Sequence, residues 1–369
     1  MSLPAVIFCA AESAAQPVAG LRLLDRLLVA AHRAGATRIT VVSAVPLPRL
    51  KRTPALGITF QIASQAPTAN HPVLALSTGV LVQASDLKRV IEQRGRLVKP
   101  DGTPLPVGVL DSISAAALDS QLAHRPALTA VGVAERVSDP TSAACATKKL
   151  WASLTSAADG LVDKYFNRPV GRVLFSKQLI HTPVSPNQVS VVATLIGVLA
   201  AWCFALGHAT AAIWGAVLLQ FSAVVDCVDG DLARVLFKES PLGKWLDLVG
   251  DQIVHLGVFV AIGVGLHRAG STAPVLWLAG AAAVGVVISF LVVLRGLRQP
   301  ETHRNSRLQK LIDATTNRDF SVLLLILAGF GRLDWFLWLT AVGVQVFWVL
   351  ALGLQLQRAP GVAPHQSTS

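Results

Sequence analysis

Long apolar segments dominate the second half of the chain, and they constrain its fold more than any other feature. A helix needs about 20 apolar residues to cross the hydrocarbon core of a bilayer. Six segments stand out, of which the fifth is short: roughly 188–207, 209–227, 245–267, 273–294, 319–331 and 335–356. Six buried helices of a soluble protein are the weaker alternative, because 53% of all residues are hydrophobic and only 14% are charged. We therefore predict an all-α bundle of six transmembrane helices over residues 185–358 and a disordered tail at 359–369.

Basic residues predict the orientation of these helices. Positively charged loops tend to stay on the cytoplasmic side. With six spans, both basic clusters, both termini and the link between spans two and three fall on that side. We therefore expect a multi-pass protein of the cell membrane whose amino-terminal part is cytoplasmic. The clusters are Lys164, Arg168, Arg172 and Lys177 before the first span, and Arg295, Arg298, Arg304, Arg307, Lys310 and Arg318 between the fourth and fifth.

The net charge of +11 fits this topology together with attraction for anionic lipid or phosphate. A basic chain also suggests nucleic acid as a partner, but no aromatic-rich basic pattern supports that function. Four cysteines, Cys9, Cys145, Cys203 and Cys227, lack CxxC spacing and are expected to be reduced.

An acidic run joins the second and third apolar segments. It covers residues 226–251 and reads DCVDGDLARVLFKESPLGKWLDLVGD. A bilayer disfavours ionised side chains, so carboxylates at such a place indicate a functional site. On helices, Asp226 and Asp229 are i, i+3 neighbours and Asp247 and Asp251 are i, i+4 neighbours, so two helix ends can direct four carboxylates into one space. The alternative is a solvated acidic loop between two helices.

Four carboxylates in one space repel one another unless cations neutralise them. Hard oxygen ligands suit Mg²⁺, Mn²⁺ or Ca²⁺, and a diphosphate substrate supplies further oxygens for one or two bridging metals. Gly230 and Ala233 leave the backbone open to close approach by a nucleotide. Arg234 can donate a fork of hydrogen bonds to phosphate, or pair with a neighbouring aspartate instead. Asp231 lies outside the regular spacing, and we expect it to be solvated or to support the neighbouring ligands.

The spacing of the run, D-x2-D-G-x2-A-R-x8-G-x3-D-x3-D, resembles the signature of the CDP-alcohol phosphotransferase (CDP-alcohol phosphatidyltransferase) family at every fixed position. The resemblance implies an integral-membrane transferase that moves a substituted phosphate group from a CDP-linked donor to an alcohol and releases CMP. It also implies one or two Mg²⁺ or Mn²⁺ ions, with two the expected number, and a homodimer. The implied metal ligands are Asp226, Asp229, Asp247 and Asp251, the general base is Asp251, and the CDP-binding residues are Asp229, Gly230, Ala233, Arg234, Gly243, Asn187 and Ser190.

The basic segment between spans four and five has two interpretations of similar weight. One is membrane topology alone, and the other is an acceptor site for a phosphorylated polyol, as the resemblance to enzymes acting on inositol phosphate implies. His255 lies one turn after Asp251, and we expect it to pack inside the bundle rather than face the site. The acceptor candidates are Arg295, Arg304, Arg307, Lys310 and Arg318, of which Arg318 is the foremost.

The substrates stay open at this point. The donor is CDP-diacylglycerol or a CDP-polyol, and the acceptor is a polyol, a polyol phosphate or a lipid alcohol, in phospholipid or inositol-phosphodiester biosynthesis. The alternative function is a cation-coupled transporter that uses the aspartates as an ion site. Carriers usually show internal repeats and ionisable groups near the bilayer midplane, and the sequence shows neither pattern.

Residues 1–140 predict a separate α/β domain. The segment 5–10 is a short apolar strand, a helix is expected at 20–34 with Gly35 at its end, and a second strand follows at 38–43. Alternating strands and helices are typical of layered α/β folds. The order of these elements resembles that of Rossmann-like, nucleotidyltransferase-type domains.

This front domain departs from the pattern of active nucleotidyltransferases. The segment AAESAAQPVAG after the first strand contains neither G-x-G nor lysine, and Ser77, Thr78 and Gly79 stand where a metal-binding aspartate is expected. We therefore expect an inactive domain kept for stability, dimerisation or regulation.

Residues 141–184 predict a linker that includes an amphipathic helix in the membrane interface, because apolar and basic residues are mixed there. The junction resembles that of proteins that fuse an inositol-phosphate cytidylyltransferase to a di-inositol-phosphate phosphate synthase, and this arrangement favours inositol-type chemistry. Asp159, Gly160, Asn167 and Arg168 carry the resemblance, and Ser190 stands where threonine is usual.

Overall fold

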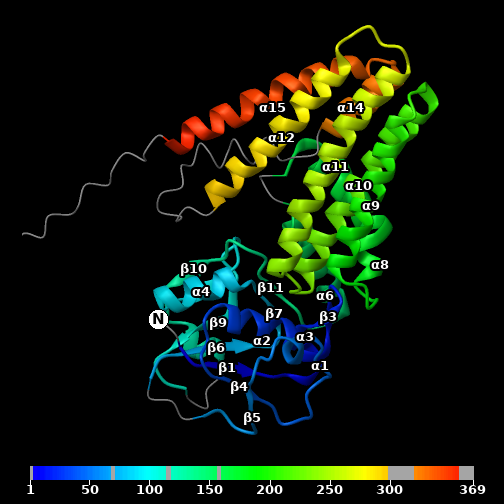
Figure 1. The fold of residues 1–369 in the computed structure, drawn as a ribbon. Coiled ribbons are helices and arrows are strands. Elements are labelled where there is room, and N and C mark those ends of the chain that lie inside the picture. The colour runs from blue at the N-terminus through cyan, green and yellow to red at the C-terminus, as the bar shows by residue number, and fades with distance from the viewer. Residues whose placement is uncertain (1–2, 68–70, 114–117, 156–158, 298–319, 357–369) are drawn as a thin grey trace, which may run out of the picture. The chain divides into compact units, whose positions relative to one another are not determined.

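The computed structural model describes residues 3–67, 71–113, 118–155, 159–297 and 320–356 (Figure 1). The chain divides into two compact units. The first comprises Met1–Leu154 with Arg234–Phe237, and the second comprises Thr155–Ala233 with Lys238–Ser369.

The first unit is built around a seven-stranded mixed sheet with the order β10-β8-β9-β6-β1-β4-β5. The strands β4, β1 and β6 are parallel neighbours, while β9 runs antiparallel to both β6 and β8. The predicted α/β domain is thereby confirmed. The strand bounds are β1 Ala5–Phe8, β4 Ile39–Val42, β5 Gln61–Ala63, β6 Val73–Ser77, β8 Arg96–Val98, β9 Pro104–Leu110 and β10 Ala127–Thr129.

Helices and two small two-stranded sheets, the hairpin β2–β3 and the pair β7–β11, complete this unit. The helix α2, Leu23–Arg33, buries nine of its residues and is followed by Gly35, whose φ of +95° suits the helix end. The segment after β1 forms the short helix α1 and the hairpin β2–β3. The remaining elements are α1 Ala11–Ala15, β2 Pro17–Val18, β3 Leu21–Arg22, α3 Arg52–Ala55, β7 Val80–Leu81, α4 Ala84–Gln93, α5 Leu118–Leu122, β11 Glu135–Arg136 and α6 Pro140–Ser153.

An ion-pair triad ties β11 to the rest of the sheet unit. The carboxylate of Glu135 receives Lys99 Nζ at 2.9 Å and also pairs with Lys149 of α6. Burial raises the pKa of Glu135, but hydrogen bonds from both lysines outweigh that effect and hold the pKa below its ordinary value.

The second unit is a helical bundle. Five of its helices in the described ranges are long and apolar enough to cross a membrane, and α14 is an apolar helix of 10 residues. The predicted bundle of apolar helices is confirmed, but the predicted count of six spans is not, because α14 is shorter than the length that a span needs. Figure 1 shows α9, α10 and α11 side by side. The bounds are α9 Pro186–Ala205, α10 Ala209–Val235, α11 Pro241–Arg268, α12 Val275–Leu297, α14 Phe320–Gly329 and α15 Leu333–Leu356.

Small residues let α9 and α11 approach closely. A Cβ on Gly250 of α11 would lie 2.5 Å from Thr194 Oγ1, and a Cβ on Gly197 of α9 would lie 2.5 Å from Val254 Cγ2. Side chains of this kind let helix backbones pack at short range in a membrane. The position of α11, and of every residue it carries, is therefore fixed against α9.

A helical segment at 163–179 precedes the bundle and packs along α10. It alternates π-type and α-type turns: η1 Asp163–Asn167, α7 Arg168–Gly171, η2 Arg172–Ser176 and α8 Lys177–Leu179. A Cβ on Gly171 would lie 3.0 Å from the carbonyl oxygen of Val224, and the rings of Phe175 and Phe221 meet edge to face at 6.0 Å. This segment is therefore in direct contact with the helix that carries the first half of the acidic run.

Candidate metal-binding site

Three aspartates of the acidic run gather at one place. Asp226 and Asp229 lie one turn apart on α10, and Asp247 lies in the second turn of α11. Each offers a carboxylate oxygen, and these oxygens all lie within 4.8 Å of one another. Several carboxylate oxygens at short range form the donor set that hard divalent cations take. The chemistry of this group therefore fits Mg²⁺ or Mn²⁺.

Both halves of the acidic run are helical, not parts of a long loop. The helix α10 continues to Val235, eight residues beyond the predicted end of the second span, and α11 begins at Pro241. Ser240 caps α11 by accepting the Gly243 backbone N–H at 3.0 Å. Asp226 and Asp229 thus project from the continuous helix that also forms the apolar span.

Ser190 of α9 is tied to the carboxylate group. Its hydroxyl donates to Asp229 Oδ2, and both residues are buried. A ligand carboxylate held by a neighbouring hydroxyl has a fixed orientation. Sequence reasoning placed Ser190 at the nucleotide, and the structure shows a contact with a metal-ligand candidate.

Asn187 and Gly243, both predicted to bind CDP, are neighbours. A Cβ on Gly243 would lie 3.0 Å from Asn187 Oδ1. A side chain at position 243 would therefore displace Asn187, which accounts for the glycine in physical terms. Gly230, Ala233 and Arg234 lie in the last two turns of α10, on the same helix as Asp226 and Asp229.

Of the two alternatives expected for Asp231, solvated or supporting its neighbours, the structure excludes the first. Asp231 is 1% exposed and receives two arginines from the preceding helical segment. Arg168 Nη1 donates to Oδ1 at 2.9 Å, and Arg172 Nε donates to Oδ2 at 2.7 Å. Arg168 also donates to Asp159 Oδ1 at 2.9 Å, and Arg172 to Thr155 Oγ1 at 3.0 Å. We call Asp231, Arg168 and Arg172 the arginine clamp.

The clamp keeps Arg168 charged. Burial alone would lower the pKa of Arg168, but the hydrogen bond with Asp159 and the charge of Asp231 raise it above its ordinary value. A buried carboxylate shared by two guanidinium groups is stable because each charge is compensated and hydrogen-bonded. Sequence reasoning noted Arg168 and Asp159 in the junction but did not connect them to the acidic run, since the partners are 63 residues apart in the case of Arg168 and Asp231.

A row of hydrogen-bonded side-chain amides and hydroxyls also holds α10 against its neighbours. Asn167 donates to Asp163 Oδ1 at 2.7 Å, Gln220 donates to Asn167 Oδ1 at 2.5 Å, and Ser321 of α14 donates to Gln220 Oε1 at 2.7 Å. Buried polar groups need such partners, because an unpaired one costs about 1–3 kcal/mol. The sequence signal for these hydrogen bonds was weak: polar residues such as Gln220 stand inside apolar segments.

Three further residues singled out from the sequence lie on α11 and α12. Asp251 is one turn beyond Asp247 and is not part of the three-carboxylate group. His255 packs against the rings of Phe259 and Phe320 at centroid distances of 6.1 and 5.2 Å, as expected for a residue inside the bundle. Arg295 lies in the last turn of α12 and is exposed. The other acceptor candidates, Arg304, Arg307, Lys310 and Arg318, lie outside the described residues, as does the tail predicted at 359–369.

Comparison with known proteins agrees with the motif. Residues 183–347 match the family model described as CDP-alcohol phosphatidyltransferase. The "Bifunctional IPC transferase and DIPP synthase" of Thermococcus kodakarensis is 32% identical over 110 residues, which cover 30% of this chain and 24% of that protein. The "Phosphatidylinositol phosphate synthase" of Cutibacterium acnes is 36% identical over 106 residues, 28% of this chain and 49% of that protein. The chain thus spans about a quarter to a half of the length of these curated relatives.

Among solved structures, the chain resembles Mycobacterium tuberculosis phosphatidylinositol phosphate synthase (PgsA1) with CDP-DAG bound. The TM-score is 0.41 at 19% sequence identity, covering 55% of this chain and 99% of that chain. A likeness at this level supports no functional argument.

Proposed function

Since residues 183–347 form a CDP-alcohol phosphatidyltransferase domain, we propose that this protein is a membrane enzyme that transfers a substituted phosphate group from a CDP-linked donor to an alcohol. The acceptor hydroxyl forms a new O–P bond, the bond between that phosphorus and the CMP oxygen breaks, and CMP leaves. The observation that carries the proposal is the convergence of Asp226, Asp229 and Asp247 within 4.8 Å, in a domain of this family.

Asp226, Asp229 and Asp247 would hold Mg²⁺ or Mn²⁺, with Asp251 available to a second ion. Bound there, the metal supplies positive charge that balances the diphosphate and the departing CMP. Ser190 keeps Asp229 oriented for this purpose through its hydrogen bond. The arginine clamp and the Thr194–Gly250 contact hold α10 and α11 in place on either side.

Asp251 is proposed as the general base that removes the acceptor proton. A base must lie within hydrogen-bond reach of the attacking hydroxyl, and Asp251 is one helical turn from Asp247 on the same helix. Gly230, Ala233, Arg234, Gly243, Asn187 and Ser190 are proposed to line the CDP subsite. The closeness of Asn187 to Gly243 and of Ser190 to Asp229 supports that grouping.

The proposed donor is CDP-diacylglycerol or a CDP-polyol, and the proposed acceptor is a polyol, a polyol phosphate or a lipid alcohol. The names of two relatives, a phosphatidylinositol phosphate synthase and a bifunctional IPC transferase and DIPP synthase, favour inositol-type chemistry. The acceptor is proposed to meet Arg295, Arg304, Arg307, Lys310 and Arg318. The protein is further proposed to be a homodimer, with its active site and front unit on the cytoplasmic side. The basic clusters flanking the spans support that orientation.

The test is CMP release by the purified protein in detergent with Mg²⁺ or Mn²⁺. CDP-diacylglycerol and CDP-inositol are each combined with polyols, polyol phosphates and lipid alcohols. We expect release with one pairing, and its loss in Asp247→Asn and Asp251→Asn. Glu239→Gln is the matched control, because Glu239 is a carboxylate of the same run that lies outside the fixed spacing. Cation flux in liposomes without CMP chemistry would instead support a carrier.

A further inference from the structure

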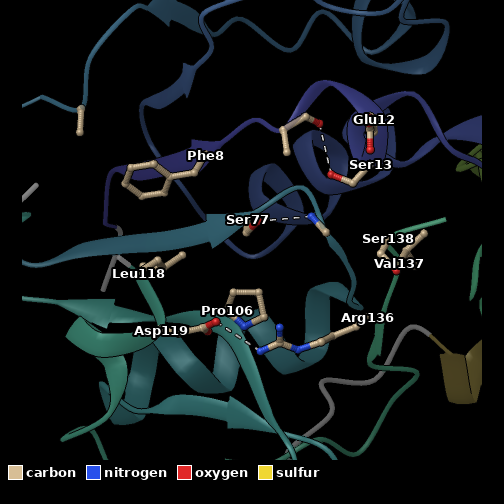
Figure 2. Close-up of a pocket in the computed structure, with 13 residues that line it drawn as sticks. Phe8, Glu12, Ser13, Ser77, Pro106, Leu118, Asp119, Arg136, Val137 and Ser138 are labelled. Atoms are coloured by element: carbon tan, nitrogen blue, oxygen red, sulfur yellow. Dashed lines mark hydrogen bonds and ion pairs between the residues drawn. The ribbon is translucent and has the colours of Figure 1, made fainter. Parts of the chain in front are cut away.

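The front unit contains a cavity that the proposed transferase chemistry does not use. It has a volume of about 800 Å³ and lies where β1 and β6 end (Figure 2). Phe8 is the last residue of β1 and Ser77 the last residue of β6, and the two are register partners in the sheet. Ligands of open α/β sheets bind outside the carboxyl ends of the strands, and small-molecule sites usually measure about 300–1,000 Å³. The position of the cavity at the strand ends and its volume are both typical of a ligand-binding site.

One wall of the cavity carries hydroxyl groups held by short-range contacts. Ser13 Oγ lies 2.9 Å from Thr78 Oγ1, which also accepts the Ala10 backbone N–H at 2.9 Å. Ser77 Oγ accepts the Gly79 N–H at 3.3 Å, as Figure 2 shows. Ser138 lines the cavity as well. These contacts orient the hydroxyl groups but leave some of their hydrogen-bonding positions open to a ligand, because each hydroxyl has one donor and two acceptor positions.

The charges around the cavity oppose a polyphosphate. Glu12 and Asp119 contribute two carboxylates, and Arg136 is the one basic residue among the lining residues. Arg136 Nη2 is engaged by Asp119 Oδ2 at 3.4 Å and by the carbonyl oxygen of Pro104 at 3.1 Å. Among the described lining residues, a nucleoside triphosphate would therefore meet two carboxylates and one arginine that is already engaged. The five-residue helix α1 is too short to offer a useful dipole in compensation.

Apolar groups form the rest of the lining. Phe8, Pro106, Leu118 and Val137 provide surface against which the face of a ring can pack. The lining thus combines an apolar surface, hydroxyl groups and carboxylate acceptors. Such a surface suits a ring that is apolar on one face and bears hydroxyl groups at its edge.

We propose that this cavity binds an uncharged, hydroxyl-rich ring compound, such as a nucleoside or a cyclic polyol, and disfavours its phosphorylated forms. The ligand hydroxyls donate to Glu12 and Asp119 and exchange hydrogen bonds with Ser77 and Ser138. The ring packs against Phe8 and its apolar neighbours. The front unit is then a binding module that works independently of the carboxylate group in the membrane unit.

Calorimetry on the full chain in detergent tests this proposal. The probes are cytidine, adenosine and myo-inositol as the two classes of uncharged ligand, and CTP with Mg²⁺ as the charged comparison. We expect at least one uncharged probe to bind at least tenfold more tightly than CTP. Ala10→Phe, at an exposed position of the lining, is expected to weaken that binding at least tenfold by filling the cavity. Ala55→Phe is the matched control, because Ala55 is an exposed alanine of α3 that does not line the cavity.

A charge variant tests the electrostatic part without any risk of overpacking. Glu12→Gln combined with Asp119→Asn is expected to narrow the difference in affinity between CTP and the uncharged probe, because it removes the two carboxylates that repel the triphosphate. The proposal is overturned if no uncharged probe binds, if CTP binds more tightly than all of them, or if Ala10→Phe leaves binding unchanged. CMP release measured on the same samples keeps the two proposals apart, since the Ala10→Phe protein is expected to retain it.

Discussion

The arginine clamp makes a sharp prediction about stability. Asp231→Asn keeps the size of the side chain but removes the negative charge that Arg168 and Arg172 share. Two short charge-assisted hydrogen bonds, at 2.9 and 2.7 Å, are affected. An amide retains one acceptor oxygen, while its NH₂ group faces guanidinium donors with which it cannot bond.

The size of the effect follows from burial. Asp231 is 1% exposed and the two arginine side chains are each 11% exposed, so water cannot replace the lost charge. Breaking a buried ion pair by removing one partner costs about 3–5 kcal/mol. Asp159→Asn is the matched comparison. Asp159 accepts a hydrogen bond from Arg168, and this substitution keeps the hydrogen bonds of both arginines with Asp231. We expect a smaller loss there, about 1.5–3 kcal/mol, the usual worth of a hydrogen bond to a charged group.

The assay is denaturant unfolding of the full protein in micelles, followed by circular dichroism. The decisive variant is the double substitution Asp231→Asn with Arg172→Gln, which removes one of the uncompensated cations. We expect the double variant to be less destabilised than the sum of its two single variants. A loss below about 1 kcal/mol for Asp231→Asn, the range of an exposed salt bridge, would refute the reasoning.

Three further outcomes are expected. Gly250→Leu should abolish CMP release and lower the melting temperature, because its Cβ meets a neighbouring helix at 2.5 Å, whereas Gly280→Leu, with nothing within 4 Å, should change neither. Ser190→Ala should weaken Mn²⁺ binding about 10–100-fold by freeing Asp229, measured by electron paramagnetic resonance, with unchanged affinity counting against that role. Glu135→Gln should lower the melting temperature above about pH 4.5, because a carboxyl with a lowered folded-state pKa stabilises the fold only when it is ionised. The difference in melting temperature from the native protein should vanish as the pH falls through the depressed pKa of Glu135. A difference that persists at low pH would contradict this origin.

The sequence predicted the carboxylate group because spacing on a helix is a local property. Asp226 and Asp229 are one turn apart on any α-helix, and only the approach of Asp247 required tertiary structure. The apolar segments likewise predicted the helical bundle, since length and composition decide membrane spans. The ends of the helices were harder to predict, because α10 continues through charged residues that a hydropathy pattern assigns to a loop.

The surroundings of the site could not be predicted, because they depend on partners distant in the chain. Asp231 looks like a solvated residue until Arg168 and Arg172 are placed against it. Ser190 finds Asp229 across 39 positions. Gly250 carried a weak signal, a glycine in an apolar helix, but only the packing against Thr194 shows why no larger residue fits there.

The continuity of α10 has a consequence for ion selectivity. Asp226 and Asp229 lie on one continuous helix, so the spacing of their backbones is fixed and only side-chain rotation can adapt their carboxylates to an ion. Asp247 lies on a second helix, α11, whose distance from α10 is set by packing in the bundle. At the proposed metal site, discrimination between small and large divalent ions would therefore depend on the separation of two helices, and residues that separate those helices would tune it without touching the ion.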